Sequence, residues 1–152
     1  MSTKEITADD VIETLKQVVA DKGEDYVYPL AGSGNGCVYA VNGEPSCIVG
    51  HVVYRLAPDL FKWMDETETE TGISEGFENL AGIWYRREAM IAVPSDFDSP
   101  WGRYIDSCPA VPDALIEASG ILAVAQEYQD NGNTWGRVLY HSTLSDEPED
   151  YE

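Results

Sequence analysis

An amphipathic pattern near the N-terminus constrains the fold of this chain more than any other feature. Between residues 7 and 22, apolar side chains recur every three or four positions, as one face of a helix requires: Val11, Ile12, Leu15, Val18 and Val19. Thr7 is suited to cap the start of this helix, and Gly23 is suited to end it. We therefore predict a helix over residues 7–22 that buries one face against the rest of the chain.

Strand-forming residues come next. Residues 26–30 and 37–41 are rich in Val and Tyr, and a Gly-rich segment joins them. The pattern predicts a β-hairpin of these two stretches, followed by a tight turn at Asn42-Gly43. From Ser46 the apolar spacing becomes helical again, and we expect this helix to end before Pro58.

The remainder of the chain alternates helical and irregular patterns. We expect a short helix from Asp59 and two C-terminal helices, one beginning at Asp113 and one capped by Thr134. The segments between them are expected to be a solvated loop at 66–71, a helical turn near 75–81 followed by strand character, and a long loop at 94–112. The predicted fold class is α+β, with one compact domain over residues 1–144 and an acidic, disordered tail over 145–152.

Charge narrows the range of partners. The chain has 28 acidic and nine basic residues, a formal net charge of −19, with acids concentrated between residues 65 and 78 and in the tail. Such a charge repels nucleic acid and anionic membranes, so we expect neither as a partner and favour a protein with a basic surface. Neither a signal peptide nor an apolar run of the roughly 18 residues needed to span a membrane is present, which indicates a cytoplasmic protein.

The most chemically suggestive pair is Cys47 and His51. A thiol in the first turn of a helix is favoured as the thiolate, and cysteine hydrolases combine that placement with a histidine. His51, however, is on the same helix as Cys47, so His141 is the other candidate base. The apolar neighbours of Cys47 favour a buried packing role, for which free cysteine is common. A cysteine-dependent enzyme or ligand-sequestering protein centred on Cys47 therefore stays an alternative to a non-enzymatic protein.

Metal and cofactor sites have weak support. The three cysteines suggest reduced thiols rather than a disulfide framework. Cys37, Cys47 and His51 could converge on a metal with Cys108, but no Cys-x-x-Cys knuckle is present. The run Gly-Ser-Gly-Asn-Gly at 32–36 lacks the Gly-Lys-Ser/Thr ending of a phosphate-binding loop. We therefore expect no metal and no cofactor.

A candidate contact surface lies in the long loop. This segment combines acids with large aromatic side chains that follow no core period, and we predict that a partner protein contacts these residues: Asp96, Phe97, Asp98, Trp101 and Tyr104. A third reading is that the acids imitate the phosphates of DNA and inhibit a nucleic-acid enzyme. That mechanism needs carboxylates on rigid elements, which disfavours it if 66–71 is a loop.

Two stretches carry a resemblance. They are G-C-V-Y-A-V-N-G-E-P-S-C-I-V-G-H at 36–51 and A-Q-E-Y-Q-D-N-G-N-T-W-G-R-V-L at 125–139. Together with the opening helix and G-E-D-Y-V-Y at 23–28, they resemble small acidic proteins encoded by actinobacterial phages and their hosts. Residues 65–110 match nothing in that group and look like an insertion. The resemblance transfers no activity; it implies a phage accessory or regulatory protein that works in the host cytosol by binding a host protein.

Overall fold

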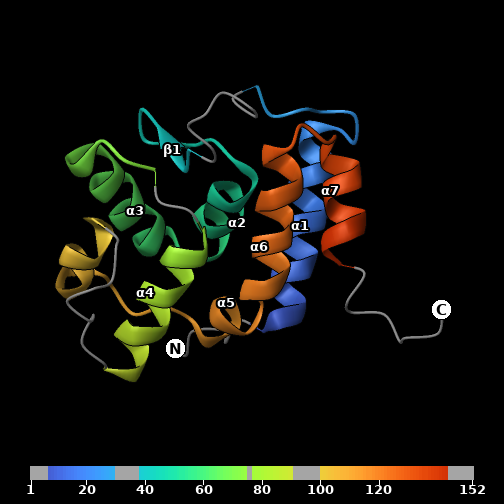
Figure 1. The fold of residues 1–152 in the computed structure, drawn as a ribbon. Helices are drawn as coiled ribbons and strands as arrows, with labels where there is room; N and C mark the ends of the chain where they lie inside the picture. Colours follow the sequence, from blue (N-terminus) through green and yellow to red (C-terminus); the bar gives the residue numbers. More distant parts are fainter. Residues whose placement is uncertain (1–6, 30–37, 75–76, 91–99, 144–152) are drawn as a thin grey trace.

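The computed structural model describes residues 7–29, 38–74, 77–90 and 100–143. Its elements, shown in Figure 1, follow in this order: α1 (Ala8–Lys22), β1 (Ala40–Val41), β2 (Glu44–Pro45), α2 (Ile48–Leu56), α3 (Pro58–Thr71), α4 (Phe77–Ala89), the 3-10 helix η1 (Pro100–Ser107), α5 (Asp113–Glu117), α6 (Ser119–Asp130) and α7 (Trp135–Ser142). The predicted α+β class, packed helices with one small antiparallel hairpin, is confirmed.

The first helix forms as its sequence predicts. The Thr7 hydroxyl accepts a hydrogen bond from the Asp10 backbone N–H at 3.2 Å, and the Asp10 carboxylate accepts one from the Thr7 N–H at 3.0 Å. This reciprocal capping box satisfies two backbone donors that a helix start leaves without partners. The five apolar residues of the predicted face are all buried. The helix ends at Gly23, which adopts a positive φ of 101°.

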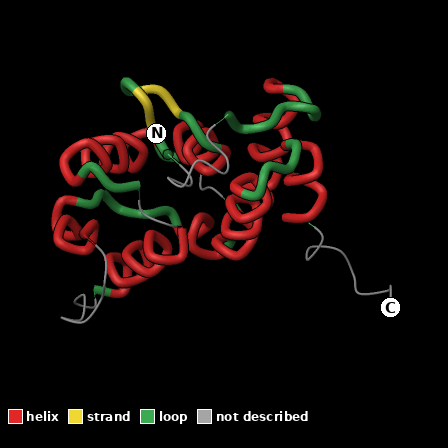
Figure 2. Tube along the Cα trace, turned by 45° about the horizontal axis from the view of Figure 1, so that its top comes forward, coloured by secondary structure: helices red, strands yellow, loops and turns green. Residues whose placement is uncertain are grey.

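The hairpin differs from its prediction. It joins β1 to β2, with Ala40 opposite Pro45, and it turns through Asn42 and Gly43 at φ 56° and 81°. A turn with two consecutive positive φ values has a backbone twist that fits the right-handed twist of paired strands. Asn42-Gly43 therefore joins the residues on either side of it, Ala40–Val41 and Glu44–Pro45, into a hairpin. Of the stretch at 26–30, Val27 instead forms an isolated bridge with Thr134. Figure 2 shows the hairpin as the strand-coloured corner of a helical molecule.

The second helix packs closely on the hairpin. It begins at Ile48 and ends at Leu56, before Pro58 as predicted. Gly50 faces the backbone of Tyr39, where a Cβ atom on residue 50 would lie 2.3 Å from the Tyr39 carbonyl oxygen. Only glycine allows this approach. The backbone N–H of Ile48 donates to the buried Gln129 side chain of α6 at 2.8 Å, which satisfies the start of the helix.

The expected loop at 66–71 is wrong, because these residues complete α3. Thr67 and Glu68 are buried and extend the apolar face that begins at Leu60. Gly72, in the left-handed conformation at φ 68°, then ends the helix. The alternation of Glu and Thr therefore belongs to a helix with one buried face, and only its other positions are solvated.

The expected strand character after residue 81 is also wrong. Residues 77–89 form α4, which buries Phe77, Leu80, Ile83 and Trp84 at helical spacing. The N–H of Phe77 donates to the Gln126 side chain of α6 at 2.9 Å, so the helix start is satisfied from a distant element. Part of the expected loop at 94–112 is ordered as η1.

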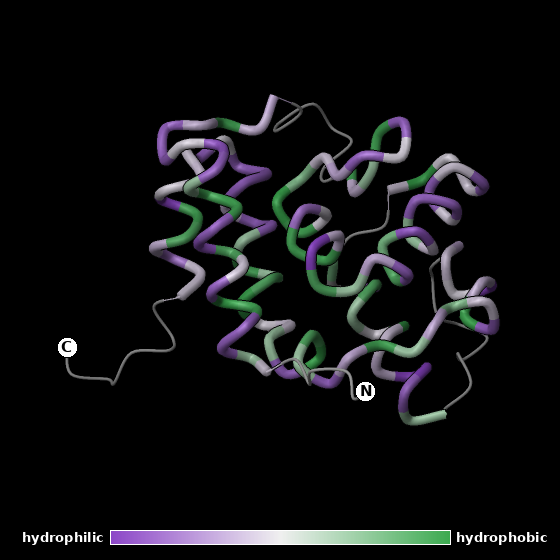
Figure 3. Tube along the Cα trace, turned by 180° about the vertical axis from the view of Figure 1, so that it is seen from behind, coloured by the Kyte–Doolittle hydropathy of each residue, from purple (hydrophilic) through white to green (hydrophobic). Residues whose placement is uncertain are grey.

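Residues 113–142 form three helices where two were expected, because the chain breaks at Ala118 between α5 and α6. The predicted cap of α7 is confirmed by a hydrogen bond from the Arg137 N–H to the Thr134 hydroxyl at 3.3 Å. In Figure 1, α1, α6 and α7 stand side by side, while α3 and α4 lie on the far side of α2. Figure 3 shows hydrophobic and hydrophilic positions alternating around these helices, as one shared core requires. Within the described segments, no helix has the length and apolar character needed to cross a membrane.

Candidate binding groove

A groove of about 230 Å³ lies between α3 and η1. One side is a single face of α3, since residues spaced by three, four and seven positions point the same way on a helix. The other side comes from η1. The lining residues are Trp63, Glu66, Thr67 and Glu70 on α3, and Tyr104 and Ser107 on η1. The groove thus combines two aromatic side chains, one of them a phenol, with two aliphatic hydroxyls and two carboxylates.

Internal hydrogen bonds fix the floor of the groove. The Trp63 indole N–H lies 3.2 Å from the Tyr104 carbonyl oxygen and 3.0 Å from the Ser107 hydroxyl oxygen, and both accept from it. The Ser107 hydroxyl donates to the Tyr104 carbonyl at 2.9 Å, and the Thr67 hydroxyl donates to the Trp63 carbonyl at 2.7 Å. The two bonds of the Trp63 indole join α3 to η1 and orient its ring, which is itself nearly buried.

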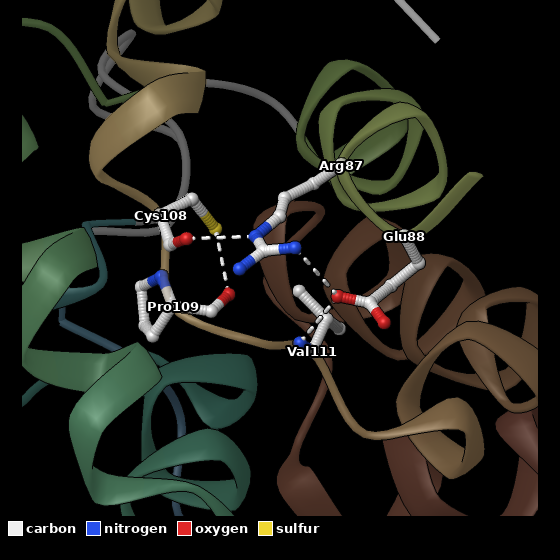
Figure 4. Close-up of polar contacts among 5 residues, drawn as sticks. All are labelled: Arg87, Glu88, Cys108, Pro109 and Val111. Atoms are coloured by element: carbon white, nitrogen blue, oxygen red, sulfur yellow. Dashed lines mark hydrogen bonds and ion pairs between the residues drawn. The ribbon is translucent and has the colours of Figure 1, made fainter. Parts of the chain in front are cut away.

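Contacts with α4 anchor the chain that leaves η1 (Figure 4). The Arg87 side chain donates from Nε to the Cys108 carbonyl at 2.8 Å. Its guanidinium also pairs with the Glu88 carboxylate at 3.5 Å, and that carboxylate accepts from the Val111 N–H at 2.9 Å. Since Cys108 directly follows the last residue of η1, α4 helps to fix the position of that wall of the groove.

Glu68 fixes the rotation of α3 from its inner side. Its two carboxylate oxygens accept from the backbone N–H groups of Tyr39 at 2.8 Å and Ala40 at 3.1 Å. Burial raises the pKa of this carboxyl above its ordinary value, while the two backbone hydrogen bonds act in the opposite direction. With Glu68 held against the hairpin, Glu66 and Glu70 are exposed and line the groove.

One of the two groove carboxylates, Glu70, lies in the last turn of α3, where a helix tolerates negative charge least, and Glu66 lies one turn before it. The C-terminal end of a helix carries partial negative charge, and α3 has no basic residue in its last turn. Glu66 and Glu70 are one helical turn apart, so they also repel each other. Among the described residues neither makes an ion pair, although Lys62 lies one turn before Glu66. Within the described part of the chain, the groove thus carries two carboxylates that are not neutralised by an ion pair.

The predicted contact residues divide into three groups. Tyr104 lines the groove and is half-buried. Trp101 is fully buried, with its indole N–H donating to the Ile73 carbonyl at 2.9 Å and its ring against Tyr39 and Trp63, so its predicted role as an exposed contact is corrected to a core role. Asp96, Phe97 and Asp98 lie outside the described residues.

Cys47 has no free thiol in the structure and so cannot form a thiolate. This residue is the N-cap of α2, is fully buried and is disulfide-bonded, which corrects the expectation of reduced thiols. A disulfide sulfur is neither a free nucleophile nor a thiolate metal ligand. His51 packs edge-on against Trp135 with ring centroids 5.8 Å apart. Burial, with smaller effects from Lys22 and Arg55, lowers the His51 pKa to about 4.

Of the remaining candidate residues, His141 and Cys108 are described, and they do not come together in a second centre. The His141 ring stacks on Tyr128 at a centroid distance of 4.4 Å, so it serves packing within the C-terminal helices. Cys108 is a free, buried thiol whose pKa burial raises to about 12. Cys37 lies outside the described residues. Over the part of the chain that is described, no three His, Cys, Asp or Glu side chains are grouped to hold a metal ion.

Sequence reasoning missed most of the groove because it treated residues 66–71 as a loop. A signal was present: the buried positions Leu60, Met64 and Thr67 continue a helical spacing, and Gly72 follows as a helix stop. Extending the helix to residue 71 would have placed Trp63, Glu66 and Glu70 on one face. The contribution of Ser107 depends on the docking of η1 and has no local sequence signal.

Comparison of this chain with protein-family models, with curated proteins and with solved structures finds no match.

Proposed function

We propose that this chain is a non-enzymatic binding protein that docks on the basic surface of a partner protein through the groove between α3 and η1. The observation that carries the proposal is the pair Glu66 and Glu70, which lacks an ion-pair partner among the described residues at the negative end of α3. A cationic side chain seated between them would remove both the mutual repulsion and the unfavourable interaction with the helix dipole.

The interaction energies expected at this groove are those of a complex that forms reversibly. An exposed ion pair contributes about 0.2–1 kcal/mol, so two pairs alone give weak binding. The net charge of −19 adds long-range attraction, which increases the association rate more than the affinity and weakens with salt. The proposed complex is therefore fast to form and strongly salt-dependent.

The resemblance to small phage proteins suggests the context of this binding. In that context the partner is a protein of the bacterial host, and the chain is an accessory or regulatory factor in the host cytosol. Disulfides are uncommon in a reducing cytosol, so the state of Cys47 tests the compartment. Because Cys47 is disulfide-bonded, thiol counting on protein alkylated inside the cell should find one free thiol among the three cysteines. Three free thiols would contradict that disulfide, whereas its persistence in the cell would count against a reducing cytosol.

The binding site is tested by a matched pair of double variants. Glu66→Gln with Glu70→Gln removes two charges from α3, and Asp9→Asn with Glu13→Gln removes two charges of the same spacing from exposed positions on α1. Each is titrated with a peptide rich in Lys and Arg at low and at high salt. The α3 variant is expected to lose most of the binding and of its salt dependence, and the α1 variant to retain both. Equal losses would show that net charge, and not the groove, carries the binding.

Nucleic-acid mimicry is a second candidate, favoured by one observation. Mimicry requires carboxylates at fixed separations, and Glu66 and Glu70 lie on a helix held by Glu68 and Trp63 instead of on a loop. The test uses a basic nucleic-acid enzyme captured by the chain. Duplex DNA should displace the chain from it under mimicry, and Glu66→Gln with Glu70→Gln should lower the concentration of DNA required. Capture that is insensitive to DNA would eliminate this candidate.

A further inference from the structure

We propose that the groove is specific for an arginine side chain and discriminates against lysine. This inference rests on the proposed function and names the group that the partner inserts. It follows from which hydrogen-bonding groups the groove has already used and from the chemistry of those it leaves open.

The donors fixed in the floor of the groove are already engaged. The Trp63 indole N–H, the Ser107 hydroxyl and the Thr67 hydroxyl each donate within the protein. What the lining offers a ligand is the four carboxylate oxygens of Glu66 and Glu70, together with the phenol of Tyr104. A group rich in donors and positively charged complements this set, whereas an anion or a simple acceptor does not.

The arrangement favours a planar cation with several donors. Glu66 and Glu70 are separated by one helical turn, which puts their Cβ atoms about 6 Å apart. A guanidinium has five N–H groups in a rigid fork that can bind more than one carboxylate oxygen at once, whereas an ammonium acts as a compact point charge. The wall of the groove also carries the half-buried aromatic ring of Tyr104, and arginine stacks on aromatic rings more readily than lysine does.

The test compares two peptides of equal length and charge in which every cationic residue is either arginine or lysine. Binding is measured for the wild-type chain, for Tyr104→Leu and Tyr104→Phe, and for Tyr85→Leu as the control. Tyr85 is an exposed tyrosine of α4 that does not line the groove. The α3 variant, Glu66→Gln with Glu70→Gln, is measured with both peptides. Near-UV circular dichroism verifies that each variant retains its packed core.

The arginine peptide is expected to bind the wild-type chain about tenfold tighter, the size of one charge-assisted hydrogen bond or stacking contact. That ratio should fall towards one in Tyr104→Leu and persist in Tyr104→Phe and Tyr85→Leu. Equal binding of both peptides, lost in the α3 variant, would overturn the arginine specificity and leave the proposed function standing. Binding of both peptides that is unaffected in the α3 variant would overturn the two together.

Discussion

The helices α1 and α3 are both rich in acidic residues and both have acids in the first turn, yet their C-terminal ends differ. In α1 the acids Asp9 and Asp10 lie in the first turn and Lys22 lies in the last. Each of these charges is therefore next to the helix end of opposite partial charge, which is favourable. In α3 the acids Glu66 and Glu70 lie towards the C-terminal end, and the last turn has no basic residue. Moreover, α1 begins with a capping box, whereas the N-cap of α3, Ala57, makes no side-chain cap.

This difference separates charges that stabilise the fold from charges that do not. The start of α1 is arranged as an isolated helix would need it, and the acid in its last turn, Asp21, is paired with Arg55 of α2 at 2.8 Å. The C-terminal half of α3 depends instead on its buried face and on Glu68, and it carries exposed acids at an energetic cost. The proposed binding site would give these groove charges a role that the fold does not require. The following changes test this contrast in decreasing order of expected effect.

The largest effect is expected inside α3 itself. Glu68→Leu leaves the backbone N–H groups of Tyr39 and Ala40 buried without acceptors. We expect the free energy of unfolding to fall by about 2–3 kcal/mol, measured by urea denaturation. Glu70→Leu, on the exposed side of the same helix, should change it by less than about 0.5 kcal/mol. Similar costs at the two positions would contradict the division of α3 into a structural face and a binding face.

The capping box of α1 is expected to have the next largest effect. Thr7→Ala removes the acceptor for the Asp10 N–H and should lower the free energy of unfolding by about 1 kcal/mol. Thermal unfolding followed by circular dichroism measures this change. Asp10→Ala and the double variant complete a cycle, in which the two costs should not add because both side chains belong to one box. Additive costs would mean that the two hydrogen bonds act independently.

His51 of α2 should also give the fold a dependence on pH. Folded His51 has a pKa of about 4, lowered by burial and by Lys22 and Arg55, against 6.5 without these effects. The unfolded chain therefore takes up this proton first, and stability falls as pH drops from about 6.5 towards 4. Because His51 is only half-buried, we expect a loss below about 1 kcal/mol between pH 7 and pH 5.

His51→Phe keeps an aromatic ring against Trp135 but cannot bind a proton. In this variant the part of the loss that is due to His51 should disappear, as measured by urea midpoints at both pH values. An unchanged loss would show that another group, for example a carboxyl, controls stability over this range.

The smallest effects are expected when the charge in the last turn of each helix is reversed, from positive to negative in α1 and from negative to positive in α3. Lys22→Glu in α1 should lower the free energy of unfolding by about 0.3–1 kcal/mol, and Glu70→Lys in α3 should raise it by a similar amount. Both shifts should shrink in high salt, because the affected side chains are exposed. Chemical denaturation at two salt concentrations measures them. Shifts of the same sign would contradict the contrast between the helices.

Local patterns predicted much of this fold, and the failures have a common physical origin. The helix of residues 8–22 and the cap at Thr134 were accessible because apolar spacing and capping chemistry are local. The strand expected in the middle failed because Ile83 and Trp84 have strand-forming side chains but pack on the core as part of a helix. Gln126 and Gln129 are fixed by helix starts 49 and 81 residues away, which a local pattern cannot reveal.

The candidate site was less accessible than the fold. Tyr104 was identified from its setting of acids and aromatics, and it does line the groove. Trp101 came from the same pattern but is buried, because sequence alone does not distinguish an aromatic residue that covers the core from one that faces solvent. The remaining lining residues depend on how η1 docks against α3, and this is a tertiary contact.

The most direct test measures stability and binding on the same two double variants, by thermal unfolding with and without the arginine-rich peptide. Glu66→Gln with Glu70→Gln should raise the unfolding temperature of the free protein and abolish the further rise caused by the peptide. Asp9→Asn with Glu13→Gln should lower the unfolding temperature and keep the rise. If instead both variants shift stability in the same direction and lose peptide binding equally, the acids of α3 are not a binding site.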